Sequence, residues 1–469
     1  MSFPKFWLLP DDTEHRGYTC NRFRSLGLCL TTGLVVLLGA CSFRPTSTEP
    51  TNLQPSPKAP AKLDTPSAAN TVTILGAITG EQQQRLEAAL APFVEATGIE
   101  VIYQGTEAFT TLLPVRVESG HKPDVVMFPQ PGLMADFARR GLLVPLDRFI
   151  DLSQLQQSYG SSWIDLGTVD QKVYGIWYRV SIKSLVWYSP KAFQAAGYQI
   201  PKTWDDLKAL SNQIVADGNV PWCLGMESGD ATGWVGTDWI EDILLRTAGP
   251  KVYDQWVKHQ IPFDSAPVRS AFKQFGQIAL DPKLVVGGTI GVLNTPFSDS
   301  PNGLFTDPPG CYLHRQASFI SNFFPQGVVL GKDVDVFLLP PIRPEFGTPI
   351  LIGGDMIAMF NDTPAARKLV QYMTTVTPHE IWASLGGYLS PNTQVDLSAY
   401  PDPVSRKQAE ILRNADVIRF DGSDMMPGTV GTESFWLGII NYMEGGDLNT
   451  ILQDIDQSWP TDGKSISEE

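Results

Sequence analysis

Histidine and cysteine are scarce in this sequence, and both are common materials of metal centres and nucleophilic active sites. Its 469 residues include five of each, and no two histidines stand at metal-ligand spacing. The Gly-x-Ser-x-Gly, His-Glu-x-x-His and Gly-x-x-x-x-Gly-Lys-Ser/Thr motifs are absent. We therefore expect no metal, no cofactor and no enzymatic activity, although the 50 Asp and Glu residues leave a glycosidase-like carboxyl pair open.

Positive charge is also in short supply. The chain has 35 Lys and Arg against 50 Asp and Glu, which gives a formal charge of -15. Nucleic-acid phosphates repel such a chain, so no nucleic-acid partner is expected. Hydrophobic residues make up 43% of the sequence and charged residues 18%, the balance of a soluble globular protein. The length suggests two or three domains, or two large lobes.

No hydrophobic run reaches the ~20 residues that a membrane-spanning helix requires. The run from Leu26 to Ala40 is shorter and follows a basic segment, which is typical of a signal peptide over residues 1–40. It ends at Cys41 in a pattern that resembles a bacterial lipobox, so we expect lipid on Cys41 and membrane contact through that lipid alone. Residues 41–70 are rich in proline and are expected to form a flexible linker.

Two cysteines remain downstream of this segment. An export signal implies an oxidising compartment, and there we expect a disulfide between Cys223 and Cys311. Two buried free thiols are the alternative.

Hydrophobic patterning predicts an α/β protein. Apolar strands at residues 71–78, 99–103 and 123–128 alternate with helices at 80–98 and 131–140, which indicates a parallel, doubly wound sheet. The middle of the chain is more helical, and the end is helical throughout. We expect two α/β lobes, each a mainly parallel sheet flanked by helices, with the chain crossing between them more than once.

Aromatic residues stand next to polar ones in three glycine-rich segments. Trp234 and Asp238 lie in the first, Arg315 in the second, and Asp421 and Asp424 begin the third. Sugars need this mixture, because their C–H faces lie on aromatic rings while their hydroxyls require paired donors and acceptors. Each residue also has a structural interpretation: tryptophan in the core, arginine in an ion pair, or aspartate as a helix cap.

Several segments, taken in order, resemble the family 1 extracellular solute-binding proteins of ABC importers, which include maltodextrin-binding proteins. They are residues 122–126 (KPDVV), 141–147 (GLLVPLD), 174–188 and 201–207 (PKTWDDL), within a similarity that covers Thr71 to Trp459. The resemblance implies a periplasmic-binding-protein (Venus flytrap) fold of class II, whose lobes close over a ligand. It places the N-terminal lobe at 71–182 plus 353–400 and the C-terminal lobe at 183–352 plus 401–469.

The resemblance also implies a function and a site. Residues 223–239 and 311–319 look most like binders of α-glucosides such as glucosylglycerol, sucrose and trehalose, so we expect a monomeric, extracytoplasmic (periplasmic) protein that passes a small glucoside to ABC permease subunits. Alternatives are a binder of a non-sugar solute, a secreted glycoside hydrolase or a sensor partner. The residues and the resemblance together nominate as ligand contacts Glu81, Thr106, Glu107, Gln130, Trp177, Tyr178, Trp234, Asp238, Arg315, Gly354, Asp355, Asp421, Asp424, Phe435 and Trp436.

Overall fold

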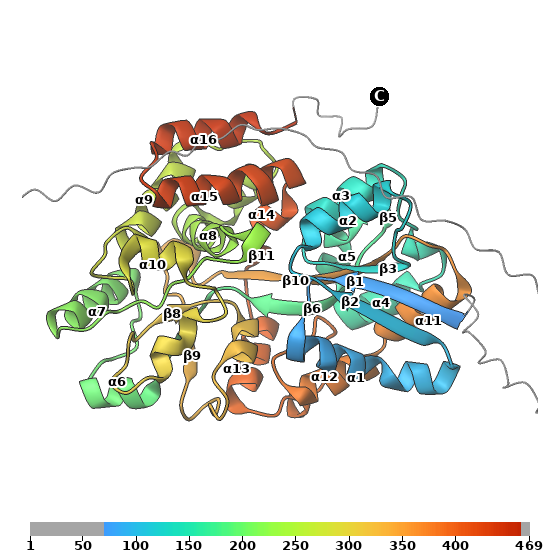
Figure 1. Ribbon diagram of the computed structural model, residues 1–469, viewed down its shortest axis with the longest axis horizontal. Helices are drawn as coiled ribbons and strands as arrows, with labels where there is room; N and C mark the ends of the chain where they lie inside the picture. The colour runs from blue at the N-terminus through green and yellow to red at the C-terminus, as the bar shows by residue number, and fades with distance from the viewer. Residues whose placement is uncertain (1–69, 461–469) are drawn as a thin grey trace, which may run out of the picture. The chain divides into compact units, whose positions relative to one another are not determined.

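A computed structural model describes residues 70–460 (Figure 1). The expected signal peptide, the lipid site Cys41 and most of the linker lie outside the described residues. Among residues 70–460, no helix is both long and apolar enough to cross a membrane.

The first sheet contains six strands. They are β1 (Thr71–Gly76), β2 (Glu100–Gly105), β3 (Val125–Phe128), β6 (Ile176–Ile182), β10 (Ile350–Met359) and β11 (Ile418–Phe420). Their order is β11-β10-β3-β1-β2, and β6 pairs with β10. Strand β1 is parallel to both β2 and β3, whereas β10 runs antiparallel to β3 and β6. Strands β2, β1 and β3 therefore form the parallel part of the sheet that the sequence predicts, and the carboxyl ends of β1 and β3 lie at the same edge of the sheet.

Helices cover both faces of this sheet. They are α1 (Gly80–Thr97), α2 (Phe109–Glu118), α3 (Pro131–Arg139), α4 (Leu152–Tyr159), α5 (Ser161–Leu166), α11 (Pro364–Met373) and α12 (Val376–Leu385). In Figure 1, α2 and α3 lie above the strands and α1 and α12 below them. The buried residues Leu86, Leu90 and Phe93 of α1 recur at helical spacing, so one side of this helix packs on the sheet.

The second sheet differs from its prediction. It has three strands in the order β8 (His314–Arg315), β7 (Leu185–Tyr188) and β9 (Asp335–Leu338), and both neighbours are antiparallel to β7. The expectation of a mainly parallel sheet is wrong for this part: although the chain between β7 and β8 is largely helical, β8 and β9 both run opposite to β7.

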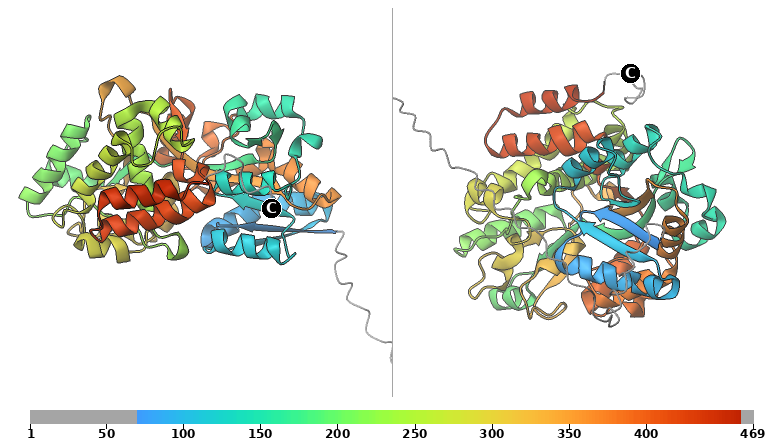
Figure 2. Two further views of the ribbon diagram at one scale, coloured as in Figure 1. Left: turned by 90° about the horizontal axis from the view of Figure 1, so that it is seen from above. Right: turned by 45° about the vertical axis from the view of Figure 1, so that its right-hand side comes forward.

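Helices make up most of the surroundings of the second sheet. They are α6 (Pro190–Ala196), α7 (Trp204–Ala216), α8 (Trp234–Val257), α9 (Ala266–Ala279), α10 (Gly288–Asn294), α13 (Pro403–Arg413), α14 (Gly422–Met425), α15 (Phe435–Met443) and α16 (Leu448–Gln457). Both views in Figure 2 show α15 and α16 packed side by side.

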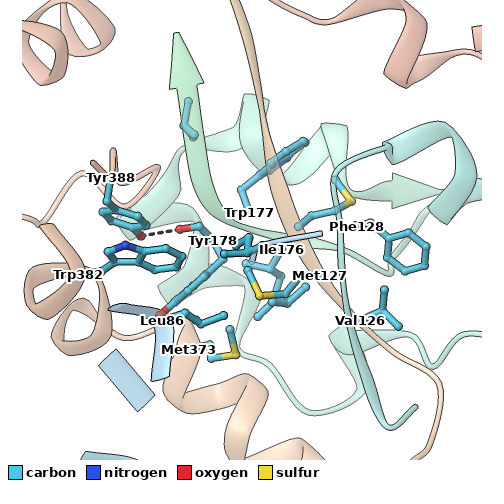
Figure 3. Close-up of a cluster of buried hydrophobic side chains, with 14 of the residues drawn as sticks. Leu86, Val126, Met127, Phe128, Ile176, Trp177, Tyr178, Met373, Trp382 and Tyr388 are labelled. Carbon is cyan, nitrogen blue, oxygen red and sulfur yellow. Dashed lines mark hydrogen bonds between the residues drawn. The ribbon is translucent and has the colours of Figure 1, made fainter. Parts of the chain in front are cut away.

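Buried side chains form two clusters, which we call the first core and the second core. The first core surrounds the six-stranded sheet and includes Trp177, Trp382 and Tyr388 (Figure 3), while the second surrounds α7, α8, α9 and α15. Only Lys183 and Ser184 separate β6 from β7, so the chain passes from one sheet to the other there. Because the first core also takes in Val336 of β9, the residue bounds of the two lobes stay a prediction.

A disulfide joins Cys223 to Cys311, whose Cα atoms are 5.5 Å apart. The two segments also pair through the backbone, since the Cys223 amide donates to the Leu313 carbonyl at 2.8 Å. The bond thus ties together two of the three glycine-rich segments recognised in the sequence.

Two fully buried histidines should make the fold sensitive to acid. Burial lowers the pKa of His314 to about 4 and that of His379 to about 3, so both are neutral at pH 7. The unfolded chain binds these protons near pH 6.5, and the folded chain does not. The free energy of unfolding should therefore fall by up to about 1.4 kcal/mol per histidine for each pH unit below 6.5.

Urea unfolding between pH 7 and pH 4.5 measures this slope. The variant His379→Gln should have a clearly smaller slope, whereas His121→Gln, which changes an exposed histidine, should keep the wild-type slope. Equal slopes for all three proteins would contradict the prediction.

Candidate functional site

A cavity of about 250 Å³ opens at the carboxyl ends of β1 and β3. Thr79 follows β1 and Gln130 follows β3, and both line it. Further parts of the lining come from α1 and α2, from the start of α8, from β6 and β10, from the segments around residues 297 and 319–323, and from α14 and α15. Parallel strands characteristically present ligand sites at this edge. The volume lies near or below the ~300–1,000 Å³ of drug-sized ligand sites, which favours a small solute.

One side of the cavity is formed by four rings, Trp234, Phe297, Phe319 and Phe323, which we call the aromatic wall. Phe297 lies at the centre, with ring centroids 5.3 Å from both Trp234 and Phe323 and 6.2 Å from Phe319. Most of the contacts are edge-to-face, so the rings hold one another in place. The wall offers a ligand a rigid apolar surface.

Arg179 and Asp355 form a buried ion pair on the polar side. Arg179 of β6 donates through Nε to Asp355 Oδ2 of β10 at 2.6 Å, and through Nη1 to Gln82 Oε1 at 2.5 Å. The strand register shifts between Asp355 and Met356, which marks a β-bulge at the cavity. The cation is therefore already neutralised from within the protein.

Lys183 lies where β6 ends. Its Nζ is 2.7 Å from Asp238 Oδ1, pairs also with Asp421, and is 5.4 Å from the centroid of the Trp234 ring. Burial by itself lowers the pKa of Lys183, but these two carboxylates outweigh it and hold the pKa well above its usual value. A Cβ at Gly353 would lie 2.6 Å from Lys183 Cε, so any larger residue at this position would displace the lysine side chain.

A second layer of buried charge lies behind Lys183. Arg315 donates to Asp242 Oδ2 at 3.0 Å, and Asp242 also pairs with Arg246. Glu241 accepts hydrogen bonds from the amides of Gly422 and Ser423, at 2.6 and 2.9 Å. These contacts fix α14, and with it Asp421 and Asp424, against α8.

Polar atoms without a protein partner line the cavity. Gln130 Oε1, Asp355 Oδ1 and Trp436 Nε1 are buried and find no hydrogen-bond partner among the described residues. Burial, followed by the neighbouring Asp421, raises the pKa of Asp424 well above its usual value. Unpaired buried polar groups are costly. These three unpaired atoms belong to residues of the cavity lining, while others, such as Trp177 Nε1 and Trp256 Nε1, lie in the two cores.

The structure brings together eight of the nominated residues. Those that line the cavity are Glu107, Gln130, Trp234, Gly354, Asp355, Asp421, Asp424 and Trp436. Their direct contact with a ligand stays a prediction. They come from four separate parts of the chain, which the sheet edge and α14 place around one space.

The other seven lie outside the cavity lining. Trp177, Tyr178 and Phe435 are fully buried in the two cores, and Asp238 and Arg315 belong to the buried ion pairs. Glu81 points to Arg85, and Thr106 accepts a hydrogen bond from the Ala108 amide. Ligand contact by these seven residues stays a prediction, and for most of them burial or ion pairing, the structural alternative, accounts for the residue.

Sequence reasoning missed Gln82, Arg179, Lys183 and three phenylalanines of the wall. Arg179 and Lys183 carried a usable signal, since each is a lone charge in or beside an otherwise buried strand, at positions 176–182. Phe319 and Phe323 lie in a short 3-10 turn. Phe319 ends the segment 311–319 that resembles α-glucoside binders, but it was not nominated as a contact, and nothing in the sequence marked Phe323.

A six-stranded sheet, a three-stranded sheet, two cores and a small amphipathic cavity define an α/β solute-binding protein. The model of the bacterial extracellular solute-binding protein family matches residues 79–377. The chain therefore belongs to this family of extracellular proteins, which confirms the resemblance noted in the sequence.

Curated relatives agree with this assignment. The osmoprotective compounds-binding protein GgtB of Synechocystis sp. is 57% identical over 389 residues, covering 83% of this chain and 92% of the relative. The alpha-glucosides-binding periplasmic protein AglE of Rhizobium meliloti is 43% identical over 397 residues, covering 83% and 87%.

Solved structures show the same fold. The bacterial solute receptor AcbH, described as specific for β-D-galactopyranose, superposes with a TM-score of 0.72 at 19% identity, covering 83% of this chain and 97% of that one. A chitin oligosaccharide binding protein gives a TM-score of 0.71 at 17% identity, covering 82% and 97%. These likenesses confirm the predicted solute-binding fold.

Proposed function

We propose that this protein captures a small, neutral glucoside and delivers it to the permease of an ABC importer. The observation that carries the proposal is the cavity itself, whose lining combines an aromatic wall with Gln130, Asp355 and Trp436, each of which has a polar atom that no described residue pairs. A sugar ring has an apolar C–H face for the first and hydroxyl donors for the second. The names of the two relatives, which refer to osmoprotective compounds and alpha-glucosides, support a compatible solute or an α-glucoside.

Charge within the cavity argues that the ligand is neutral. Arg179 and Lys183 are both paired with carboxylates, so neither cation is free for an anionic ligand. Gln130 and Asp355 offer unpaired acceptor atoms, and an acceptor repels a ligand carboxylate or phosphate. A donor-rich, uncharged polyol fits both observations.

The N-terminal segment indicates where the protein works in the cell. We propose that residues 1–40 direct export, that Cys41 carries lipid, and that residues 41–70 tether the folded part to a membrane. The apolar run before Cys41 and the family's extracellular location support this. Mass spectrometry of the protein purified from membranes tests it: an unmodified N-terminus upstream of Cys41 would contradict the anchor.

Titration calorimetry against a panel of solutes tests the ligand class. We expect heat of binding with glucosylglycerol, sucrose or trehalose, and none with glucuronic acid, glycine betaine or spermidine. Binding of betaine or spermidine alone would replace the glucoside by a solute with an ammonium group, which the aromatic rings and carboxylates of the cavity can also bind. Release of glucose during the titration would support hydrolysis instead.

A variant of the aromatic wall links the heat to this cavity. Trp234→Ala should weaken binding about 5- to 140-fold, because truncating an aromatic anchor costs roughly 1–3 kcal/mol. Trp459→Ala is the matched control, since that ring stacks on His259, with centroids 4.3 Å apart, and does not line the cavity. Equal affinities of the two variants would place the ligand elsewhere.

A further inference from the structure

Glu81, expected to contact the ligand, instead organises a neighbouring arginine. Arg85 lies one helical turn further along α1, and its Nη2 is 2.5 Å from Glu81 Oε1. The guanidinium is directed by this pair toward two further acceptors. Its Nη1 donates to Asn322 Oδ1 at 2.8 Å and to the Gly386 carbonyl at 2.9 Å.

Asn322 has every part of its amide engaged. Its oxygen accepts from Arg85, and its Nδ2 donates to the carbonyls of Phe319 and Gly387, at 2.8 and 3.1 Å. Gly387 is held close: a Cβ there would lie 1.9 Å from Asn322 Oδ1, and its φ is 65°. The side chain of Asn322 thus packs directly against the backbone of Gly387, whose left-handed conformation favours glycine.

The residue is placed between two rings of the aromatic wall. Asn322 belongs to the 3-10 turn η5 (Ser318–Phe323), whose members Phe319 and Phe323 both line the cavity. A turn of this kind has few internal hydrogen bonds to hold it. Arg85 and the loop after α12 therefore supply contacts that fix η5, and with it half of the wall, to the helices of the first core.

We propose that Arg85 and Asn322 are positioning residues that keep η5 closed on a bound solute and slow its release. Neither lines the cavity, so neither needs to touch the ligand. The inference rests on the proposed function, since it concerns the same cavity. Loss of the pair frees η5 to move away from the ligand, which accelerates dissociation more than it slows association.

Stopped-flow tryptophan fluorescence with glucosylglycerol, sucrose and trehalose measures both rates. For Arg85→Ala and Asn322→Ala we expect the dissociation rate to rise about 10-fold, as for one charge-assisted hydrogen bond, with association changed by less than 3-fold. The double variant should be no faster than the larger single effect, because both side chains serve one contact. Arg85→Lys, whose single ammonium nitrogen cannot hold Glu81 on one side and Asn322 and Gly386 on the other as the two Nη atoms do, should fall between Arg85→Ala and wild type.

The matched control is another arginine–asparagine pair. Arg269 of α9 donates to Asn449 of α16, and neither residue lines the cavity. Arg269→Ala should keep the wild-type release rate. Wild-type release rates in the Arg85 and Asn322 variants would overturn the proposal.

Hydrogen exchange without ligand separates this inference from the proposed function. Backbone amides of residues 318–323 should exchange faster in Arg85→Ala than in wild type or Arg269→Ala. Unchanged exchange in that segment would overturn the positioning role even if none of the three sugars bound, whereas failure of wild type to bind any of them would reject the glucoside alone. Arg85 retains solvent exposure of 21%, so its variants are expected to fold.

Discussion

Replacing Lys183 with methionine is expected to lower the free energy of unfolding by about 3–5 kcal/mol, because it leaves buried carboxylates without their cation. Asp238 and Asp421 both pair with Lys183, and both are almost completely buried. Methionine fills a similar volume, so the loss measures charge more than packing. Chemical denaturation at pH 7 gives the value.

The stability lost in Lys183→Met should also depend on pH, because the two carboxyls titrate. Without Lys183 the pKa of the two carboxyls should rise, because burial then acts unopposed. A carboxyl whose pKa is raised in the folded state destabilises the fold as pH increases from about 4 toward that raised value. The difference between Lys183→Met and wild type should therefore be smaller at pH 4 than at pH 8.

An exposed lysine provides the control. Lys208 pairs with Asp205 at 2.8 Å, but their side chains are 48% and 89% exposed. Lys208→Met should change stability by less than about 1 kcal/mol, as for surface ion pairs generally. Equal losses in the two variants, or a loss that does not depend on pH, would contradict the role assigned to Lys183.

Removing the disulfide should have the other large effect. Cys223 and Cys311 are 88 residues apart in sequence, and opening so long a loop gives the unfolded chain considerable entropy. For Cys223→Ser combined with Cys311→Ser we expect a loss of about 2–5 kcal/mol of unfolding free energy. Urea denaturation of the double variant, and of wild type with and without reductant, measures it.

The outcome also bears on the site. Both cysteines are adjacent to segments that carry Arg315 and the start of α8, so part of the loss should appear as weaker ligand binding. Wild type with reductant should match the double variant; a midpoint that neither treatment moves would show that the bond contributes nothing to stability.

The six-stranded sheet could be predicted from sequence because local patterns and tertiary structure agree there. The strand that ends at Gly76, the helix capped by Gly98 and the strand at Val125 each have a local hydrophobic pattern and residues that mark where the element ends. The three-stranded sheet could not be predicted equally well. Its strand β8 is two residues long, and only its partners in space make it a strand.

The nominated residues that line the cavity are mostly those that follow a recognisable strand or turn. Gln130 after β3 and Asp421 after β11 are of this kind. The nominations did not distinguish the sides of a strand: Trp177 and Tyr178 are buried in the core, while Arg179 from the same strand reaches the cavity. Every residue of β6 except Arg179 is fully buried, so alternation gave no indication of which residue faces the ligand.

Strand β10 has a consequence for the order in which the protein can be made. This strand occupies residues 350–359, yet it lies between β3 and β11 and also pairs with β6. The strands that precede it in this sheet, β1, β2, β3 and β6, all end by residue 182. A growing chain therefore leaves β3 with an unpaired edge while some two hundred further residues are synthesised. The strands of the N-terminal half therefore cannot complete the six-stranded sheet until β10 has been synthesised, which is when about three quarters of the chain exists.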